Sequence, residues 1–290
     1  MGSNVAAAKN LPDLRFSPIV LVDDTGRFRQ GEDRTITLGE PVLDLALALQ
    51  SGASVTPDAL ARRPAWVPAT NLLRLREATP AADDPRARNG AKVYCTLRFA
   101  ISKDVQRSQK ATGIDLPEGE NLQACFVDGD TDGLFETVFA LGTEDEDFAL
   151  PSSIDPLAYR TQTNVPMGDL RWRLVAKQED RTRSLGALGL LSQRQVFQAQ
   201  TNGATGRYDE AQTGLIGSAC GQTTIPIDTG FKTSRLPRTY SFGCAEIAVT
   251  DYDKRTRTLT YRIARPMPEQ PVSLTVSFLD IYGGTIYTLD

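Results

Sequence analysis

No histidine occurs among the 290 residues of this chain. Histidine is the commonest general base in enzymes and a frequent ligand of zinc and iron, so its absence excludes Ser-His-Asp and Cys-His catalysis and histidine-based metal centres. The glycine motifs that bind phosphates or dinucleotides are also missing, as is the Gly-x-Ser-x-Gly nucleophile motif. Hydrolases that work with two carboxylates stay open, but no pair of acids stands out for that role. We therefore do not expect an enzyme.

Long apolar runs and basic patches are missing too. The most apolar stretches, Ile19–Val22 and Leu43–Leu49, are far shorter than the roughly 18 residues of a membrane-spanning helix. The net charge of −4 is small, and arginines are interleaved with acidic residues, which argues against a nucleic-acid partner.

The first residues lack the charged start and the apolar core of a signal peptide. Met1-Gly2-Ser3 is instead typical of a segment that replaces a removed leader. We therefore expect the mature form of an exported protein, whether periplasmic, cell-surface or secreted.

Only four cysteines are present, and none forms a Cys-x-x-Cys pair. Four cysteines allow three disulfide pairings. The simplest pairing joins sequence neighbours, Cys95 with Cys125 and Cys220 with Cys244, because each pair lies in adjacent strand-like runs. The alternative is four buried thiols in a cytosolic protein. The even count, together with the acidic loop described below, favours disulfides and an oxidising compartment.

Most of the chain has the pattern of β-strands. Apolar and polar residues alternate in short runs that are rich in branched and aromatic side chains and are separated by turn residues. The clearest runs are Phe16–Val22, Arg34–Leu38, Lys92–Ile101, Leu170–Ala176, Tyr240–Val249, Thr258–Ile263, Val272–Phe278 and Thr285–Leu289.

Two stretches instead favour short helices. Pro41–Gln50 is apolar around most of a helical surface, which predicts a buried helix. Thr56–Arg63 begins with a capping threonine, a proline at the first helical position and an aspartate in the first turn. We therefore predict a mainly β fold, an antiparallel β-sandwich-like architecture with one or two short helices in the N-terminal third.

Composition also indicates where domains divide. Residues 1–12 are small and polar and are expected to form a disordered tail. The polar, proline-bearing segment Thr79–Gly90 is the best candidate for a boundary. It would separate an N-terminal β-plus-short-helix region, residues 13–85, from a β-rich domain, residues 86–290. One continuous domain of residues 13–290 is the alternative.

The stretch with the most specific chemistry joins two strand-like runs near the middle of the chain. It carries aspartates at alternate positions, then a glycine and a glutamate, an arrangement of hard oxygen ligands that suits Ca²⁺. The expected ligands, at loop positions 1, 3, 5, 7 and 9, are Asp128, Asp130, Asp132, the backbone carbonyl of Leu134, and Glu136. An EF-hand is excluded because position 12 holds a phenylalanine and the flanks favour strands rather than helices.

The spacing resembles the Asp-x-Asp-x-Asp-Gly-x-x-Asp loops of integrin-type FG-GAP repeats, with Glu136 in place of the last aspartate. In that family the loop joins two strands and binds Ca²⁺ through four carboxylates and a carbonyl. The resemblance covers Asp128 to Glu136 and the strands on either side. It implies a calcium loop with a structural role; it does not imply a propeller, which needs several such repeats.

Simpler interpretations of the acidic residues stay open. The loop at Asp128 could be a solvated hairpin turn, although clustered carboxylates without a cation would repel one another. The acidic run Glu144–Asp147 and the pair Asp251 and Asp253 are interpreted as a solvated loop and as turn residues.

Three functions follow from these observations. We favour an exported, calcium-stabilised structural or binding module without catalysis. A subunit of a cell-surface assembly, in which Phe16–Val22 pairs with another protomer by strand exchange, is the first alternative. A carboxylate-dependent carbohydrate hydrolase, with Trp66 and Trp172 as candidate cleft residues, is the second.

Overall fold

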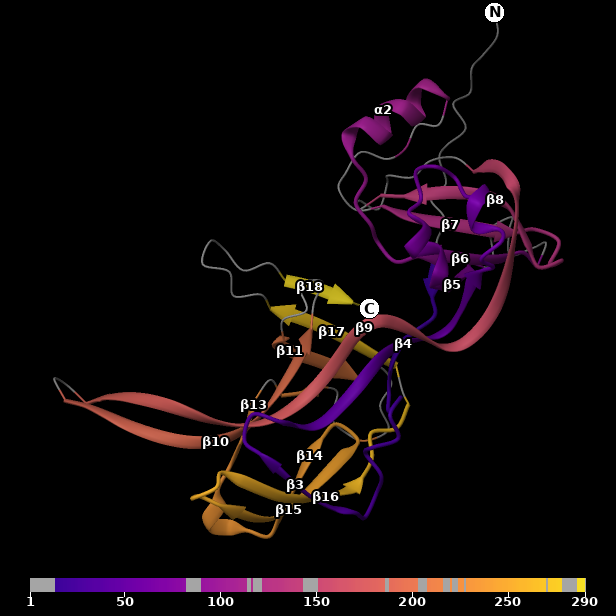
Figure 1. Ribbon diagram of the computed structural model, residues 1–290. Helices are drawn as coiled ribbons and strands as arrows, with labels where there is room; N and C mark the ends of the chain where they lie inside the picture. Colours follow the sequence, from indigo (N-terminus) through magenta and orange to yellow (C-terminus); the bar gives the residue numbers. More distant parts are fainter. Residues whose placement is uncertain are drawn as a thin grey trace, which may run out of the picture. The chain divides into compact units, whose positions relative to one another are not determined.

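A computed structural model of the chain is shown in Figure 1. It describes residues 14–81, 90–113, 116, 122–142, 151–185, 188–202, 208–215, 220, 224–226, 228–269, 271–277 and 286–289. The chain folds into two compact units, and each is made of two separate stretches. The first unit comprises Met1–Ser17 and Leu49–Val165, and the second comprises Pro18–Ala48 and Pro166–Asp290.

The first unit is an antiparallel sheet with little free edge. Its strands are β1 (Leu14–Phe16), the end of β4 (Pro41–Val55), β5 (Leu75–Pro80), β6 (Lys92–Thr96), β7 (Gln123–Asp128), β8 (Leu134–Leu141) and the start of β9 (Ser152–Leu185). Neighbouring strands run in the order β1-β5-β6-β7-β8-β9-β4, and β4 also pairs with β5. The pairing therefore closes on itself, which satisfies backbone groups that an open sheet would leave exposed.

Both faces of the central strands in the first unit are buried. Along β7, Ala124 and Phe126 pack into one apolar cluster, whereas Cys125 and Val127 pack into a second cluster. This alternation is the two-residue period of a strand. The strand therefore holds its last residue, Asp128, at the end of a rigid, fully packed element.

The second unit contains two sheets. A four-stranded sheet has the order β14 (Arg238–Phe242), β15 (Ala245–Asp253), β16 (Thr258–Arg265) and β3 (Asp33–Thr37). The other sheet contains the remainder of β4 and β9 together with β2 (Ile19–Val22), β10 (Leu188–Asn202), β11 (Tyr208–Leu215), β12 (Thr224–Ile225), β13 (Asp228–Phe231), β17 (Pro271–Ser277) and β18 (Ile286–Leu289). Beyond their packed portions, β9 and β10 continue as a long two-stranded ribbon (Figure 1).

An aromatic cluster fills the core of the second unit. Phe197 of β10 lies 4.8 Å from Phe231, 5.4 Å from Tyr240 and 5.2 Å from Phe242, measured between ring centroids. The tilted and edge-on arrangements of these rings are the favourable ones. A hydrogen bond of 3.0 Å from the buried Tyr261 hydroxyl to the Val42 carbonyl links β16 to β4.

The predicted fold class is confirmed: the structure is mainly β, antiparallel and sandwich-like, with few helices. The placement of the helices is wrong. Pro41–Gln50 lies in β4, because a strand buried on both faces reads as a continuous apolar run. Thr56–Arg63 forms a turn and the short 3-10 helix η1 (Leu60–Arg62).

The remaining helical segments are also short. The 3-10 helices η2 (Ala69–Leu73) and η3 (Thr233–Arg235) lie in the first and second units. The α-helix α2 (Lys103–Ala111) has Ser102 as its N-cap residue, and the Ser102 hydroxyl accepts a hydrogen bond from the Val105 N–H. Among the described helices, none has the length and apolar character needed to cross a bilayer.

The units do not follow the expected boundary between residues 85 and 86, since the chain passes from one unit to the other at residues 17/18, 48/49 and 165/166. The expected disordered tail, residues 1–12, lies outside the described residues, as does Glu144–Asp147.

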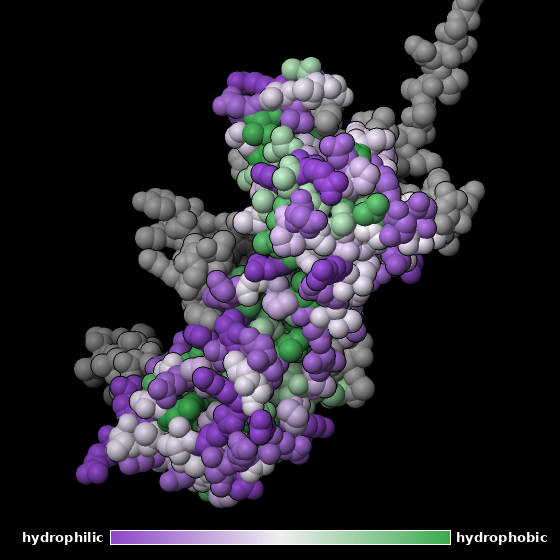
Figure 2. Space-filling view, turned by 45° about the vertical axis from the view of Figure 1, so that its right-hand side comes forward, coloured by the Kyte–Doolittle hydropathy of each residue, from purple (hydrophilic) through white to green (hydrophobic). Residues whose placement is uncertain are grey.

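In Figure 2, hydrophobic residues form scattered patches among hydrophilic ones. Leu73 is the only large hydrophobic residue that is exposed in the described part of the chain.

Candidate metal centre

The acidic loop closes the hairpin between β7 and β8. β7 ends at Asp128 and β8 begins at Leu134. The turn between them contains two residues with positive φ, Thr131 at 65° and Gly133 at 89°. Glycine adopts this conformation at little cost. The turn thereby reverses the chain within a few residues and brings its acidic side chains to one point.

Four carboxylates converge at this turn. One oxygen from each of Asp128, Asp130, Asp132 and Glu136 lies within 4.8 Å of the others. Asp128 is completely buried, Glu136 is half-buried, and Asp130 and Asp132 are exposed. The cluster is therefore anchored in the protein on one side and open to solvent on the other, so that an ion has a route to it.

Backbone N–H groups orient these carboxylates. The Gly129 N–H donates to Glu136 Oε2 at 3.3 Å, and the Gly133 N–H donates to Asp128 Oδ2 at 3.1 Å. The Leu134 N–H donates to Asp132 Oδ1 at 2.8 Å. These bonds hold one oxygen of each carboxylate against the loop and leave the other oxygen available.

Asp128 has the feature most specific to ion binding. Its Oδ2 accepts hydrogen bonds from the Tyr159 hydroxyl at 2.6 Å and from the Gly133 N–H. Its Oδ1 is buried and has no hydrogen-bond partner. A buried carboxylate oxygen without a partner is strongly unfavourable, and native proteins seldom contain one unless an ion or water completes it. The donor set, four carboxylates around one buried oxygen, fits a hard divalent cation.

The electrostatics of the cluster also favour a cation. Burial, and then the charges of Asp128 and Asp130, raise the pKa of Glu136, although a hydrogen bond from Gly129 opposes this. Burial and the hydrogen bond to Asp128 raise the pKa of Tyr159 well above its usual value, so Tyr159 stays a neutral donor. Tyr159 also stacks on Phe135, with ring centroids 4.1 Å apart, which fixes its hydroxyl beside Asp128.

Comparisons of the chain with protein-family models, curated proteins and solved structures gave no match.

The four predicted side-chain ligands come together as the sequence predicted. The Leu134 carbonyl stays a predicted ligand, because the described hydrogen bond between Leu134 and the cluster is made by its N–H, which donates to Asp132. Sequence reasoning missed Tyr159, which is 31 residues from Asp128 and reaches it only because β9 pairs beside β8. The sequence contains no local signal for this contact.

Both predicted disulfides, Cys95–Cys125 and Cys220–Cys244, are present, and no described cysteine is free. Cys95 and Cys125 are directly opposite each other on β6 and β7. The first disulfide therefore fixes the strand that ends at Asp128.

At the turn after β15, Asp253 accepts a hydrogen bond from the Arg255 N–H at 2.8 Å, which agrees with its interpretation as a turn residue.

Proposed function

We propose that this protein is an exported, calcium-stabilised β-rich structural or binding module without catalysis. The observation that carries the proposal is the buried, unpartnered Oδ1 of Asp128, a residue that is one of four whose carboxylates converge. An ion there would complete the coordination of Asp128 and cancel the repulsion among its neighbours. Because the loop joins two strands of a packed sheet, the ion would stabilise the hairpin rather than take part in a reaction.

Export is supported by the two disulfides, which form and persist in oxidising compartments. Ca²⁺ is the ion we propose because extracellular and periplasmic proteins meet it at concentrations that suit weak, solvent-open oxygen sites. Mg²⁺ is a poorer candidate, since it demands near-ideal octahedral geometry and gives up its water reluctantly.

Neither alternative function gains support from a particular observation. The run Phe16–Val22, which suggested strand exchange, pairs within its own chain: β1 pairs with β5, and β2 pairs with β17. Trp66 and Trp172, the aromatic residues suggested for a carbohydrate cleft, are both buried in the core.

Isothermal titration of the metal-free protein with CaCl₂ tests the proposal. We expect one Ca²⁺ per chain with a dissociation constant between about 10⁻⁶ and 10⁻³ M, the range of sensor and extracellular sites, and weaker binding of Mg²⁺. Asp130→Ala removes one ligand whose side chain is exposed, so it should weaken Ca²⁺ binding at least about tenfold without disturbing the core.

The matched control is Asp169→Ala. Asp169 is an exposed aspartate of β9 in the second unit, and its side chain makes no hydrogen bond or ion pair to any described residue. This variant should bind Ca²⁺ like the wild type. The absence of saturable binding by the wild type at about 10 mM Ca²⁺, well above the range of extracellular sites, would refute the proposal.

A further inference from the structure

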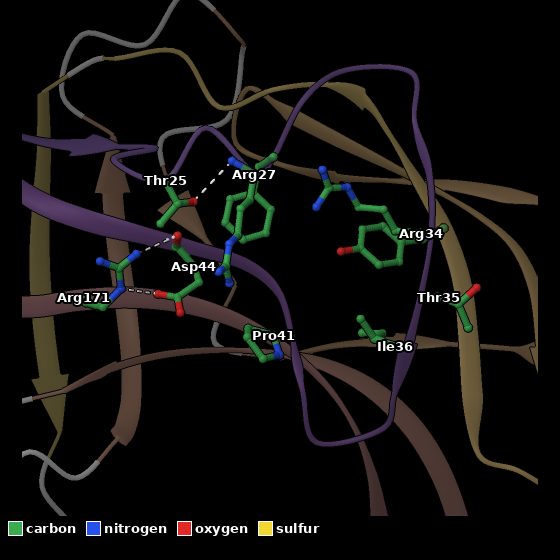
Figure 3. A pocket seen from close by; sticks show the side chains of 10 residues that line it. Thr25, Arg27, Arg34, Thr35, Ile36, Pro41, Asp44 and Arg171 are labelled. Atoms are coloured by element: carbon green, nitrogen blue, oxygen red, sulfur yellow. Dashed lines mark hydrogen bonds and ion pairs between the residues drawn. The ribbon is translucent and has the colours of Figure 1, made fainter.

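The second unit contains a pocket of about 350 Å³ with an excess of positive charge on its walls. Its lining comes from the segment before β3, from β3 itself, from the start of β4, and from β9 and β16 (Figure 3). The charged residues that line it are Arg27, Arg34, Arg171 and Asp44. Pockets of roughly 300 to 1,000 Å³ are the ones that bind small molecules.

Two of these charges are used within the protein. Arg171 Nε donates to Asp44 Oδ1 at 2.5 Å, and both Nη atoms of Arg171 donate to the carboxylate of Asp24 at 3.0 Å. The second oxygen of Asp44 accepts from Arg173 Nε at 3.0 Å. These charge-assisted bonds fix one wall of the pocket and saturate Asp44. Of the other two arginines, Arg34 pairs with Glu32 through Nη2, whereas the Arg27 guanidinium has no partner among the described residues, so Arg27 carries the excess positive charge.

Arg34 stands on the inward face of its sheet. In the pairing of β3 with β16, Arg34 is directly opposite Tyr261, and Ile36 is opposite Leu259. Tyr261 and Leu259 are buried, and the residues that alternate with Arg34 and Ile36 along β3 are exposed. Arg34 thus occupies a position at which the alternation of the strand favours an apolar residue.

The guanidinium of Arg34 is only partly satisfied. Its Nη2 pairs with Glu32 Oε2 at 3.2 Å, and the group lies 5.8 Å from the centroid of the Phe28 ring. Its Nε is buried and has no hydrogen-bond partner. Figure 3 shows the Arg34 side chain extending into the pocket. Nη1 of Arg34 makes no hydrogen bond to any described residue and, unlike Nε, is not buried, so an anionic oxygen in the pocket could accept a hydrogen bond from it.

Neither Arg27 nor Tyr261 accepts a hydrogen bond from Arg34. The guanidinium of Arg27 makes no hydrogen bond or ion pair to any described residue, so it adds a second available cation. Burial raises the pKa of Tyr261 to about 12, which keeps its ring neutral, and its hydroxyl donates to the Val42 carbonyl. Phe28, Ile36 and Pro41 supply an apolar wall.

We propose that this pocket binds a small organic anion. A carboxylate or phosphate group of the ligand would accept hydrogen bonds from Arg34 Nη1 and from the Arg27 guanidinium, and its apolar part would contact Phe28, Ile36 and Pro41. The proposal does not depend on the metal loop, because the loop belongs to the first unit and every residue that lines the pocket belongs to the second.

The test is a titration of the full-length, ¹⁵N-arginine-labelled protein observed through its arginine Nε–H resonances. The probes are phenyl phosphate and benzoate, with inorganic phosphate and benzyl alcohol as the two halves of the expected ligand. We expect a saturable shift of the Arg34 resonance with phenyl phosphate, benzoate or both. Comparing the two affinities shows whether the pocket prefers a phosphate or a carboxylate. Benzyl alcohol should have no effect, and inorganic phosphate should bind more weakly than phenyl phosphate.

Three variants locate the binding site. Arg34→Met removes the charge and the donors but keeps an unbranched apolar stem, and we expect it to lower the affinity at least about tenfold. Arg27→Met should also lower the affinity. Arg107→Met is the control, since Arg107 is exposed on α2 in the first unit and should leave binding unchanged. Thermal unfolding of each variant establishes that it is folded.

Four results would overturn the proposal. The first is no saturable shift with either anionic probe at about 20 mM, a concentration at which even very weak specific binding is seen. The others are equal binding of benzyl alcohol, inorganic phosphate that binds as tightly as phenyl phosphate, and a folded Arg34→Met variant with unchanged affinity. If Arg34→Met does not fold, unchanged affinity in Arg27→Met together with an unmoved Arg34 resonance in the wild type would overturn it as well.

Discussion

The Asp128→Asn variant is expected to reverse its stability relative to the wild type when calcium is added. In chelator, Asp128 is a buried charge that faces three other carboxylates within 4.8 Å, with one oxygen unpartnered. Asparagine removes that charge and keeps an oxygen that can accept from Tyr159 and from the Gly133 N–H. In calcium, the same substitution removes the ligand that the protein holds most rigidly.

The magnitudes can be worked from the geometry. Two unit charges 4.8 Å apart repel by about 1 kcal/mol in water and by about 3.5 kcal/mol at the effective dielectric constant of a protein surface. Asp130 and Asp132 are exposed, so the lower value applies to them. The neutral acceptor makes weaker hydrogen bonds, at a cost of about 1 kcal/mol. With all three neighbours counted at the lower value, the substitution relieves about 3 kcal/mol of repulsion, so the free energy of unfolding of the variant should exceed that of the wild type by about 2 kcal/mol in chelator.

In calcium the order should be the opposite. At a hundredfold excess over the dissociation constant, binding to the native state alone stabilises the wild type by about 2.7 kcal/mol. For the first unit, which has 134 residues (17 in Met1–Ser17 and 117 in Leu49–Val165), this corresponds to a rise of roughly 5 to 10 °C in Tm. The variant should show a rise of less than about 2 °C, because its affinity is too low for that calcium concentration to matter.

Circular dichroism melts of both proteins, in chelator and in calcium, measure the four Tm values. Asp169→Asn, a change of the same chemistry at an exposed strand position of the second unit, controls for a general effect of charge. Equal destabilisation of Asp128→Asn in chelator and in calcium would refute the reasoning. It would mean that Asp128 acts through its hydrogen bonds in an ordinary hairpin turn. A full calcium shift in the variant would refute it as well.

Three further predictions concern the disulfide and the ion pairs. Replacing Cys95 and Cys125 together by alanine should lower stability by about 3 to 4 kcal/mol in urea unfolding, because the disulfide closes a stretch of 30 residues, and a change below about 1 kcal/mol would contradict this. Arg171→Met should lower the free energy of unfolding by about 2 to 4 kcal/mol in the same assay, because it leaves Asp24 and the partly buried Asp44 without their shared partner. An unchanged free energy of unfolding would show that these ion pairs make no net contribution to stability. The hydrogen bond from Arg171 lowers the pKa of Asp24 below the usual 3.8, so the stability from this pair is fully present above that pH and is lost as the pH falls through the lowered pKa. A pH series of melts should therefore show a steeper loss below about pH 4 in the wild type than in Arg171→Met, and parallel curves would contradict the linkage.

The sequence predicts the acidic cluster well because its chemistry is local. The ligands lie within nine residues, the turn requires a glycine, and apolar runs mark the strands on both sides. Tyr159 could not be predicted, since its contact with Asp128 depends on which strand pairs beside β8. The anion pocket could not be predicted for the same reason: Arg34 and Tyr261 become neighbours only through the pairing of β3 with β16.

The wrong helix at Pro41–Gln50 has a physical explanation. Leucine and alanine favour helices in isolation, but a strand that is buried on both faces has the same composition. Gly52 indicates the strand more reliably than the leucines do. A Cβ atom at this position would lie 2.3 Å from the Leu75 carbonyl oxygen, so only glycine lets the β4 and β5 backbones approach this closely.

The division of the second unit between the two ends of the chain has a consequence for biosynthesis. β2 and the first half of β4 emerge early, yet Tyr261, which binds the Val42 carbonyl, follows 219 residues later. At about 5 to 20 residues per second, β2 and β4 can pair with each other early, but the Val42 carbonyl would wait on the order of 10 to 40 seconds for Tyr261, and β2 would wait a similar time for β17. Trimming the C-terminal strands would therefore remove β17 from the edge of β2 and leave the Val42 carbonyl without the Tyr261 hydroxyl, while β2, β4 and β9 keep one another as neighbours.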